Sequence, residues 1–265
     1  MGANYKNWIP KGMIAGLAAG TAVLAAGTAA TLILGNKFNM NTTTRNIIAG
    51  ILGVGALGCL KATQWSISAY KAFSYNGKRK LSKQIIDGTA DYVKLPEGGV
   101  GLDVGCGSGA LAIACAKRNP QGKMIGIDRW GGEYKSFSKQ LCEENAVEEG
   151  VDNVEFRQGD ACKLDFPDEY FDAVTSNYVY HNIMGKDKQE LLKETLRTLK
   201  KGGTFAIHDI MSKGRYGDMQ KFVNELYEEG YEKVRLLDTT DGKFMSKWES
   251  RKMMLAGSSL LVGVK

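Results

Sequence analysis

One long run of residues without charge constrains the fold of this chain more than any other feature. It covers the 25 residues between Lys11 and Lys37 and reads GMIAGLAAGTAVLAAGTAATLILGN. As an α-helix it would extend over about 37 Å, at about 1.5 Å per residue. That length exceeds the roughly 30 Å of a bilayer's hydrocarbon core. We therefore predict a membrane-spanning helix at about residues 12–36.

A second apolar run favours a helical hairpin. The run NIIAGILGVGALGCL begins at Asn46 and continues to about residue 70 if Lys61 extends its amino group to the membrane surface. Trp65 and Tyr70 then lie where aromatic side chains favour the membrane interface. The many glycines of both runs allow helices to approach closely in lipid, within one chain or between copies as a homo-oligomer. The predicted helices are at about 12–36 and 46–70.

Charge is divided unevenly along the chain. The first 84 residues hold ten Lys or Arg and no Asp or Glu, whereas the remainder holds 25 basic and 29 acidic residues. The basic segment KAFSYNGKRKLSK favours the cytoplasmic face and anionic headgroups. We predict a two-pass anchor in the cell membrane over residues 1–75, with both termini and a domain of residues 76–265 in the cytoplasm. Because residues 85–265 are mildly acidic, nucleic acid is not an expected partner.

Two other interpretations of the N-terminal third stay open. A cleaved signal peptide would need a shorter apolar core and a small-residue cleavage site, and here a second apolar run follows. A soluble helical hairpin is also consistent, because Ala and Gly are only weakly hydrophobic. Elsewhere, five cysteines without a CxxC pair and only two histidines argue against a metal site and a disulfide framework.

The C-terminal two thirds of the chain alternates short apolar runs with helical segments. The first four strand candidates are GVGLDV, KMIGID, VEFRQGD and FDAVTSN. This alternation is typical of an α/β fold, a mostly parallel sheet with crossover helices.

The first of these strands runs into a glycine-rich turn, LDVGCGSGA. Its glycines allow a tight turn and a close approach of the backbone to a ligand at a helix N-terminus. By itself the turn also satisfies the dinucleotide-binding pattern, through Gly105, Gly107 and Ala110. The additional signal is a carboxylate at each of three successive strand ends: Asp103, Asp128 and Asp160.

In this order the motifs resemble the class I S-adenosylmethionine-dependent methyltransferases, and most closely the quinone-biosynthesis C-methyltransferases. The resemblance extends from about Lys80 to Lys265. It implies a Rossmann-like sheet of seven strands with helices on both faces, whose last strand, SSLLVGVK, is antiparallel. It also implies S-adenosylmethionine as the cofactor, bound by Asp103, Gly105, Cys106, Gly107, Gly109, Asp128, Arg129, Trp130, Gly159, Asp160, Ala161 and Asn177.

The resemblance assigns parts of the cofactor to these residues. Asp103 and the glycine turn would hold the methionine part, and Asp128 the ribose. Asp160 and Ala161 would lie against the adenine, and Asn177 would border the methionine end. Cys106 has no base beside it in the sequence, so we expect a small filler there and not a nucleophile.

The segment that follows Asp128, RWGGEYKSFS, is a few residues longer than the resemblance implies. Trp130 would stack on the adenine or roof the pocket, or else pack on a neighbouring helix. Gly131 and Gly132 would let the loop fold back before Glu133 begins the next helix. We predict that the Trp130–Tyr134 insertion is this chain's own addition to the site.

Acceptor-side groups should project from the C-terminal ends of the fourth and fifth strands. There the sequence places both of its histidines, in SNYVYHNI and IHDI. We predict catalytic roles for Tyr178, His181 and His208, with packing in the core as the alternative for each; a general base is needed only if the acceptor must lose a proton. The Asn-Pro-Pro-Tyr type of motif is absent, which favours a small, lipophilic or lipid-like acceptor over a base or amide nitrogen.

Three other functions compete with this prediction. The same turn could serve a nicotinamide-dependent reductase, but QGDA and LDFPDEYFD argue against it. A cofactor-binding protein without catalysis would keep the fold, although Asp103, the glycines and Asp128 are all in place. An RNA methyltransferase tethered by the basic segment would show a steep salt dependence of RNA binding.

Overall fold

The computed structural model of the chain describes residues 2–131 and 136–265, which form two compact units. Residues 7–80 make up one unit. Residues up to 6 belong to the other unit, together with residues 81–265. Residues 2–6 are therefore part of the α/β domain.

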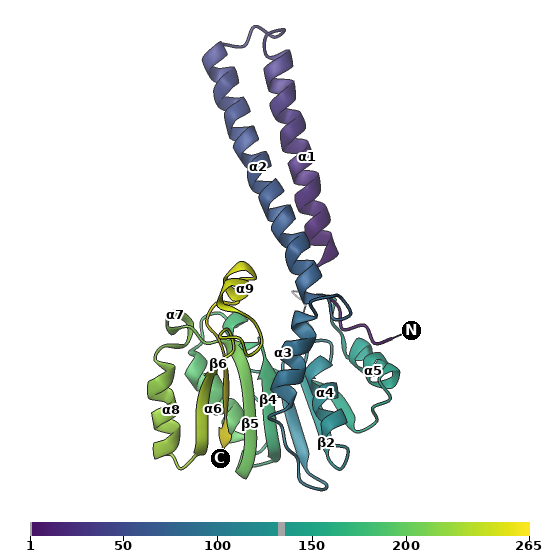
Figure 1. The fold of residues 1–265 in the computed structure, drawn as a ribbon, viewed down its shortest axis with the longest axis vertical. Coiled ribbons are helices and arrows are strands. Elements are labelled where there is room, and N and C mark those ends of the chain that lie inside the picture. The colour runs from purple at the N-terminus through teal and green to yellow at the C-terminus, as the bar shows by residue number, and fades with distance from the viewer. Residues whose placement is uncertain (1, 132–135) are drawn as a thin grey trace. The chain divides into compact units, whose positions relative to one another are not determined.

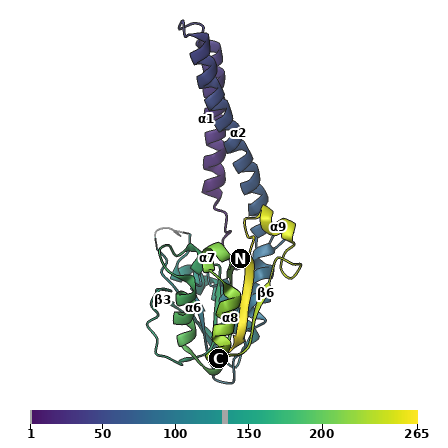
Figure 2. The same ribbon diagram turned by 90° about the vertical axis from the view of Figure 1, so that its left-hand side faces the viewer.

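The unit of residues 7–80 is a helical hairpin. Helices α1 (Lys11–Leu34) and α2 (Thr42–Phe73) run side by side as an antiparallel pair (Figures 1 and 2). By length and composition both are able to cross a membrane, with mean hydropathies of 1.9 and 1.5. Their most apolar windows are 0% and 17% buried. A helix in the core of a soluble protein would be mostly buried, so this exposure sets the pair apart from such helices.

Helix α2 is longer at both ends than the predicted 46–70. It begins at Thr42 because the Asn41 side chain caps it, accepting a hydrogen bond of 2.8 Å from the amide of Thr43. It continues without a break through Lys61 to Phe73. The predicted pair of long apolar helices is thus present, with a shorter connection between them.

Only some of the hairpin's glycines lie between its two helices. A Cβ atom at Gly27 would come within 3.4 Å of Leu52, and one at Gly55 within 3.3 Å of Leu24. No atom of the described residues lies within 4 Å of a Cβ built at Gly12, Gly16, Gly50 or Gly58. The close approach expected from the glycine pattern therefore involves one face of each helix, and the other glycines face outward.

A seven-stranded sheet forms the centre of the α/β domain, in the order β3-β2-β1-β4-β5-β7-β6 (Figure 1). Strand β7 pairs antiparallel with both β5 and β6, and the other pairs are parallel. The predicted Rossmann-like sheet with an antiparallel last strand is confirmed. The strands are β1 (Val100–Val104), β2 (Lys123–Asp128), β3 (Val154–Gln158), β4 (Phe171–Asn177), β5 (Leu199–Ile210), β6 (Glu232–Asp238) and β7 (Ser258–Val264).

Helices cover the sheet and close its ends. They are α3 (Leu81–Ala90), α4 (Ala110–Arg118), α5 (Lys139–Glu148), the 3-10 helix η2 (Tyr180–Asn182), α6 (Lys188–Arg197), α7 (Lys213–Tyr216), α8 (Met219–Glu228) and α9 (Lys247–Lys252). Helix α5 begins after Ser138, whose side chain accepts a hydrogen bond of 3.1 Å from the amide of Leu141. The predicted helix start at Glu133 falls outside the described residues.

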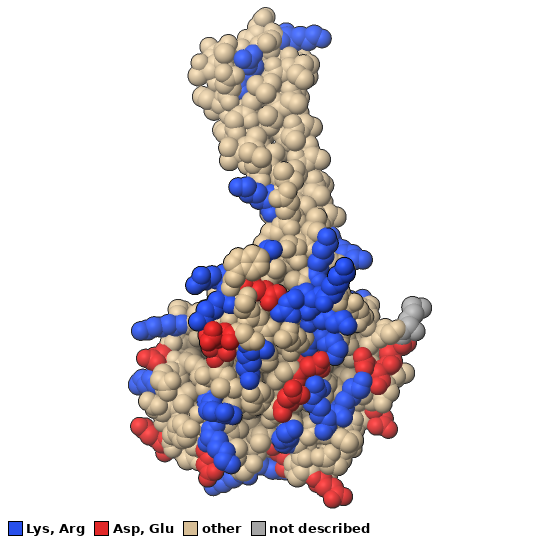
Figure 3. All heavy atoms as spheres, in the orientation of Figure 1, with Lys and Arg blue, Asp and Glu red and all other residues tan. Residues whose placement is uncertain are grey.

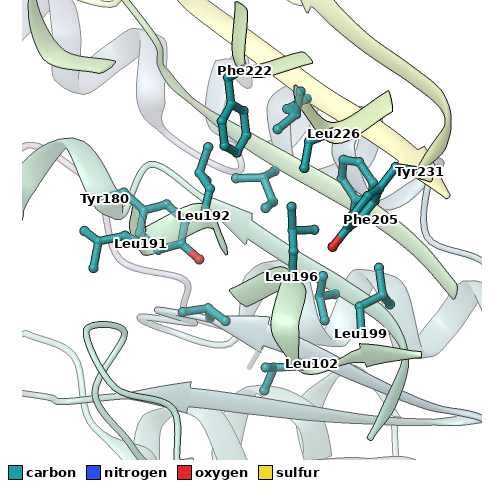
Figure 4. Close-up of a cluster of buried hydrophobic side chains, with 14 of the residues drawn as sticks. Leu102, Tyr180, Leu191, Leu192, Leu196, Leu199, Phe205, Phe222, Leu226 and Tyr231 are labelled. Carbon is teal, nitrogen blue, oxygen red and sulfur yellow. The ribbon is translucent and has the colours of Figure 1, made fainter. Parts of the chain in front are cut away.

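The main hydrophobic core lies between the sheet and helices α6 and α8. Leu192 of α6 and Phe222 of α8 are fully buried there with Phe205 of β5 (Figure 4). Burial of one such side chain stabilises the fold by roughly 1.5–3 kcal/mol. Leu102 and Val104 of β1 join this core. Because neighbouring strand residues point to opposite faces, Asp103 between them points to the face on which α4 packs.

Candidate active site

The glycine turn joins β1 to α4 at the edge where the parallel strands end. Gly105, Gly107 and Gly109 have φ values of +73°, +56° and +82°, a region that favours glycine. A Cβ at Gly105 would also come within 2.3 Å of the side chain of Val179. The turn therefore needs glycine for its backbone angles, and at Gly105 for space as well.

The carboxylate of Asp128, at the end of β2, holds this turn from the side. Its Oδ2 accepts a hydrogen bond of 2.9 Å from the amide of Gly107, and its Oδ1 accepts one of 2.8 Å from the amide of Trp130. Each carboxylate oxygen has a second lone pair. Asp128 is partly exposed, so both oxygens can also accept hydrogen bonds from the hydroxyls of a bound ribose.

Trp130 folds back on the same turn. Its backbone is left-handed, with a φ of +42°, and its Nε1–H donates to the carbonyl oxygen of Gly107 at 2.9 Å. The indole therefore lies on the glycine turn, at a carbonyl that Cys142 of α5 also bonds. Arg129, beside it, is exposed. The rest of the predicted insertion is described only up to Gly131, and Gly132 to Tyr134 lie outside the described residues.

Asp103 is a buried carboxylate beneath the turn. It is 1% exposed, and its Oδ2 has no hydrogen-bond partner among the described residues. Burial raises the pKa of this carboxyl well above its usual range, an effect that the backbone amide of Ala112 opposes and the charge of Asp128 reinforces. A cation beside this oxygen would stabilise the charged form. The site thus fits a ligand that carries an amino group, as S-adenosylmethionine does.

The end of β3 lies beside Asp128. The amide of Gly159 donates to the carbonyl oxygen of Asp128 at 3.0 Å. The Asp160 side chain is exposed and accepts a hydrogen bond of 2.9 Å from the amide of Cys162, and Ala161 between them is half-buried. These residues form a shallow wall next to Asp128, where the resemblance expects the adenine. Cys106 is buried, and burial raises the pKa of its thiol, which fits a filler.

The exit of β4 closes the other side of the turn. Tyr178 has a φ of +55°, and its hydroxyl bonds to Ser258 Oγ at 2.7 Å. Burial raises the pKa of that phenol. Val179 then packs on Gly105. Two residues later His181 sits in η2. The contact between Val179 and Gly105 thus brings the backbone of the acceptor side next to the cofactor turn.

His181 is held by a buried carboxylate. Its Nδ1 bonds to Oδ1 of Asp209, and its backbone amide donates to Oδ2 of Asp209 at 3.1 Å. The hydroxyl of Tyr216 also donates to Oδ2, at 2.8 Å. Burial would raise the pKa of Asp209, but these hydrogen bonds, led by that of His181, lower it below its usual value. Asp209 is therefore a carboxylate at neutral pH.

This arrangement fixes the orientation of the His181 ring. Because a carboxylate accepts at Nδ1, that nitrogen carries a proton, and in the neutral tautomer the lone pair is on Nε2. Nε2 has no hydrogen-bond partner within residues 2–131 and 136–265. The His181 side chain is 14% exposed and that of Asp209 is 0% exposed. The pair resembles a general base with its orienting carboxylate.

His208, the second histidine, sits in a different environment. It is fully buried, with Nδ1 bonded to the Asn177 side chain at 2.8 Å and Nε2 to Thr239 Oγ1 at 2.9 Å. Burial lowers its pKa to about 3, against the opposing charge of Asp209. Both nitrogens have partners, so His208 is suited to holding Asn177 in place rather than to moving a proton. Asp209 and Tyr216 were not among the predicted site residues, although Asp209 stands next to His208 in IHDI.

Comparisons with known proteins identify the family. A family profile described as a methyltransferase domain matches residues 96–253. Demethylmenaquinone methyltransferase of Lactobacillus johnsonii is 30% identical over 172 residues, which cover 61% of this chain and 68% of that relative. The 2-phytyl-1,4-naphtoquinone methyltransferase of Thermosynechococcus vestitus is 31% identical over 120 residues, 45% of this chain and 49% of that relative.

A solved structure shares the fold. It is geranyl diphosphate C-methyltransferase from Streptomyces coelicolor A3(2), in complex with Mg²⁺, geranyl-S-thiolodiphosphate and S-adenosyl-L-homocysteine. The TM-score is 0.55 at 15% identity, and the match covers 74% of this chain and 80% of that one. At this identity the likeness concerns the fold alone.

Proposed function

This chain belongs to the family of class I S-adenosylmethionine-dependent methyltransferases, and on that premise we propose that it methylates a small, lipophilic, quinone-like acceptor at a membrane. In this proposal His181 is the general base. The carrying observation is that His181 pairs with the buried Asp209 and lies two residues after Val179, which contacts Gly105 of the glycine turn. The cofactor-side residues keep the roles that the resemblance gives them.

The chemistry divides between the cofactor and the chain. S-adenosylmethionine, when bound, supplies a methyl group on a positively charged sulfur for in-line displacement. A hydroxylated ring becomes a stronger nucleophile, at oxygen or at the adjacent carbon, as its O–H proton leaves. Nε2 of His181 accepts that proton, and the carboxylate of Asp209 stabilises the imidazolium that forms. Tyr216 and the buried surroundings hold Asp209 in position.

The acceptor class rests on the relatives. The two curated relatives are named for demethylmenaquinone and for a phytyl-bearing naphthoquinone. A reduced ring of that kind carries the hydroxyl that a base such as His181 would deprotonate. We infer the same class for this chain, because the base lies within the part of the chain that the family profile matches.

The hairpin supports delivery of such an acceptor from a bilayer. Figure 3 shows the surface of its two helices almost without charged atoms, as lipid contact requires. We propose that α1 and α2 anchor the chain as a two-pass hairpin, with both termini on the cytoplasmic side. The basic residues that follow α2, Lys78, Arg79 and Lys80, favour that side. In this proposal the anchor is residues 7–80, and residues 2–6 belong with the catalytic domain.

The segment of residues 239–257, between β6 and β7, adds a second membrane-facing element. On its inner side Phe244 packs its ring 5.4 Å from that of His208. On its outer side Trp248 and Met254 are 69% and 71% exposed, among the exposed basic residues Lys247, Arg251 and Lys252. An exposed indole among cations is typical of contact with anionic headgroups. We propose that this segment contacts anionic headgroups at the membrane surface.

The decisive experiment uses the full chain in bilayer discs, with S-adenosylmethionine labelled in its methyl group. The acceptors are a prenylated quinol that lacks the methyl group, the same ring without its tail, and phosphatidylethanolamine. We expect label in the quinols, with faster transfer to the tailed one. Label in the lipid headgroup alone would overturn the quinone-like class. No transfer to any quinol by protein that binds the cofactor would overturn the proposal as a whole.

A further inference from the structure

A short segment before the hairpin is built into the catalytic domain. Residues 2–6, which we call the strap, group with residues 81–265 and not with the helices that follow. Tyr5 is only 6% exposed. Tyr5 precedes the glycine turn by about 100 residues, and the roles given above to the turn and to the His181–Asp209 pair do not explain its burial.

The strap is held by the side chain of Asn145 in α5. Oδ1 of Asn145 accepts a hydrogen bond of 2.6 Å from the backbone amide of Asn4, and Nδ2 donates one of 3.2 Å to the carbonyl oxygen of Asn4. Nδ2 also donates to the carbonyl oxygen of Ser108 at 3.0 Å. Asn145 is 1% exposed, so its bond to Ser108 is shielded from water, and its two bonds to the exposed Asn4 are partly buried. One buried amide therefore joins the strap to the glycine turn.

A second bond joins them directly. The hydroxyl of Ser108 donates to the carbonyl oxygen of Tyr5 at 3.0 Å. Ser108 lies between Gly107 and Gly109, whose backbone angles shape the turn. On the inner side, Asp128 and Trp130 hold Gly107 through its amide and carbonyl groups. The turn is thus held by Asp128 and Trp130 through Gly107 and by the strap through Ser108.

We propose that the strap is a positioning element of the cofactor site, so that affinity for S-adenosylmethionine depends on residues that precede the apolar hairpin. A flexible glycine turn must be ordered to bind the cofactor, and the strap supplies part of that order beforehand. Helix α1 starts at Lys11, so only residues 6–10 separate Tyr5 from it. Removing the N-terminal third to obtain a soluble enzyme would therefore remove a part of the cofactor site.

The test measures cofactor binding to the full chain by calorimetry. Deletion of residues 2–5 should weaken cofactor binding about tenfold. A tenfold change in Kd corresponds to the net free energy of about one hydrogen bond. The KM for S-adenosylmethionine should rise, and the KM for the acceptor should stay the same. Asn145→Ala should have the same effect, and Ser108→Ala a smaller one.

A matched pair of variants isolates the backbone bond. Asn4→Ala keeps the backbone amide that donates to Asn145 and loses only the side-chain bond to the amide of Lys6, so it should weaken cofactor binding less than Asn4→Pro does. Asn4→Pro lacks that amide and should bind several times more weakly. Hydrogen exchange of residues 105–112 without cofactor should be faster in the deletion and in Asn4→Pro. Unchanged affinity and unchanged exchange in the deletion would overturn the proposal, whether or not an acceptor is methylated.

Discussion

The cofactor side and the acceptor side of the active site are built from different materials. On the cofactor side, the site is formed mainly by backbone amides, glycine conformations and two carboxylates. Asp103, Asp128 and the turn lie within 26 residues of one another. On the acceptor side, the central pair joins His181 to Asp209, which are 28 positions apart in the sequence. The two constructions span similar lengths of sequence, but the first uses mainly backbone groups, held by the side chains of Asp128 and Trp130. The second depends on two particular side chains meeting across the ends of separate strands.

This difference suggests a division of roles. A turn made of backbone groups can bind the same cofactor in many relatives, whereas side chains at strand ends can be exchanged to suit each acceptor. Substitutions on the acceptor side should therefore change the rate of transfer and leave cofactor affinity intact. Substitutions on the cofactor side should do the reverse.

The largest effect is expected at the base. His181→Ala should lower the rate of methyl transfer by about 100- to 1000-fold, the usual contribution of a general base. Asp209→Asn should have a similar effect, because it removes the charge that stabilises the imidazolium. Single-turnover transfer with labelled cofactor measures both. Calorimetry should show unchanged affinity for S-adenosylmethionine in both variants. A loss of affinity in either would contradict the division of roles between the two sides of the site.

The next largest effect is expected in the dependence of stability on pH, through the buried His208. The pKa of His208 in the folded chain is about 3, below the roughly 6.5 of an unfolded histidine. Its contribution to stability is thus present above about pH 6.5 and is lost as the pH falls towards 3. The free energy of unfolding should decrease by about 1.4 kcal/mol per pH unit in that window. Denaturant titrations should show that the free energy of unfolding depends less steeply on pH in His208→Gln than in the parent. An equal slope in both would mean that another group is responsible for the pH dependence.

A smaller effect is expected at the end of β2. Asp128→Ala should weaken cofactor binding by more than ~1 kcal/mol, because hydrogen bonds to a charged group are lost. It also frees the amides of Gly107 and Trp130 from their shared acceptor. Calorimetry measures the affinity, and the rate at saturating cofactor should stay close to that of the parent. An unchanged affinity would remove Asp128 from the cofactor site.

The smallest effect is expected at the outer surface of residues 239–257. Trp248→Ser should lower turnover of a tailed acceptor in anionic discs only a few-fold, since the hairpin would still hold the chain at the membrane. Val147→Ser is the matched control, because Val147 is 79% exposed on α5. Turnover of the untailed ring should not change in either variant. Equal turnover by Trp248→Ser and its control would argue against membrane contact through this segment.

Much of the architecture could be predicted because its signals are local. The length of the uncharged run predicts the first helix, and the alternation of apolar runs predicts the sheet, as does the resemblance. Prediction was poorer at the boundaries. The start of α2 depends on Asn41 acting as a cap, and that of α5 depends on Ser138. Such caps depend on whether one side chain reaches a nearby amide, and hydrophobic periodicity carries little information about that.

The sequence by itself determined the class of fold, the glycine turn and the three strand-end carboxylates, because each follows from residues that are close together in the chain. It placed both histidines at the ends of β4 and β5, but it did not distinguish between them. The tertiary structure decided that His181 pairs with Asp209 while His208 is buried against Asn177 and Thr239. It also joined Asn4 to Asn145 across 141 positions. The physical reason is that such pairs depend on strand register and helix placement, which only the folded chain fixes.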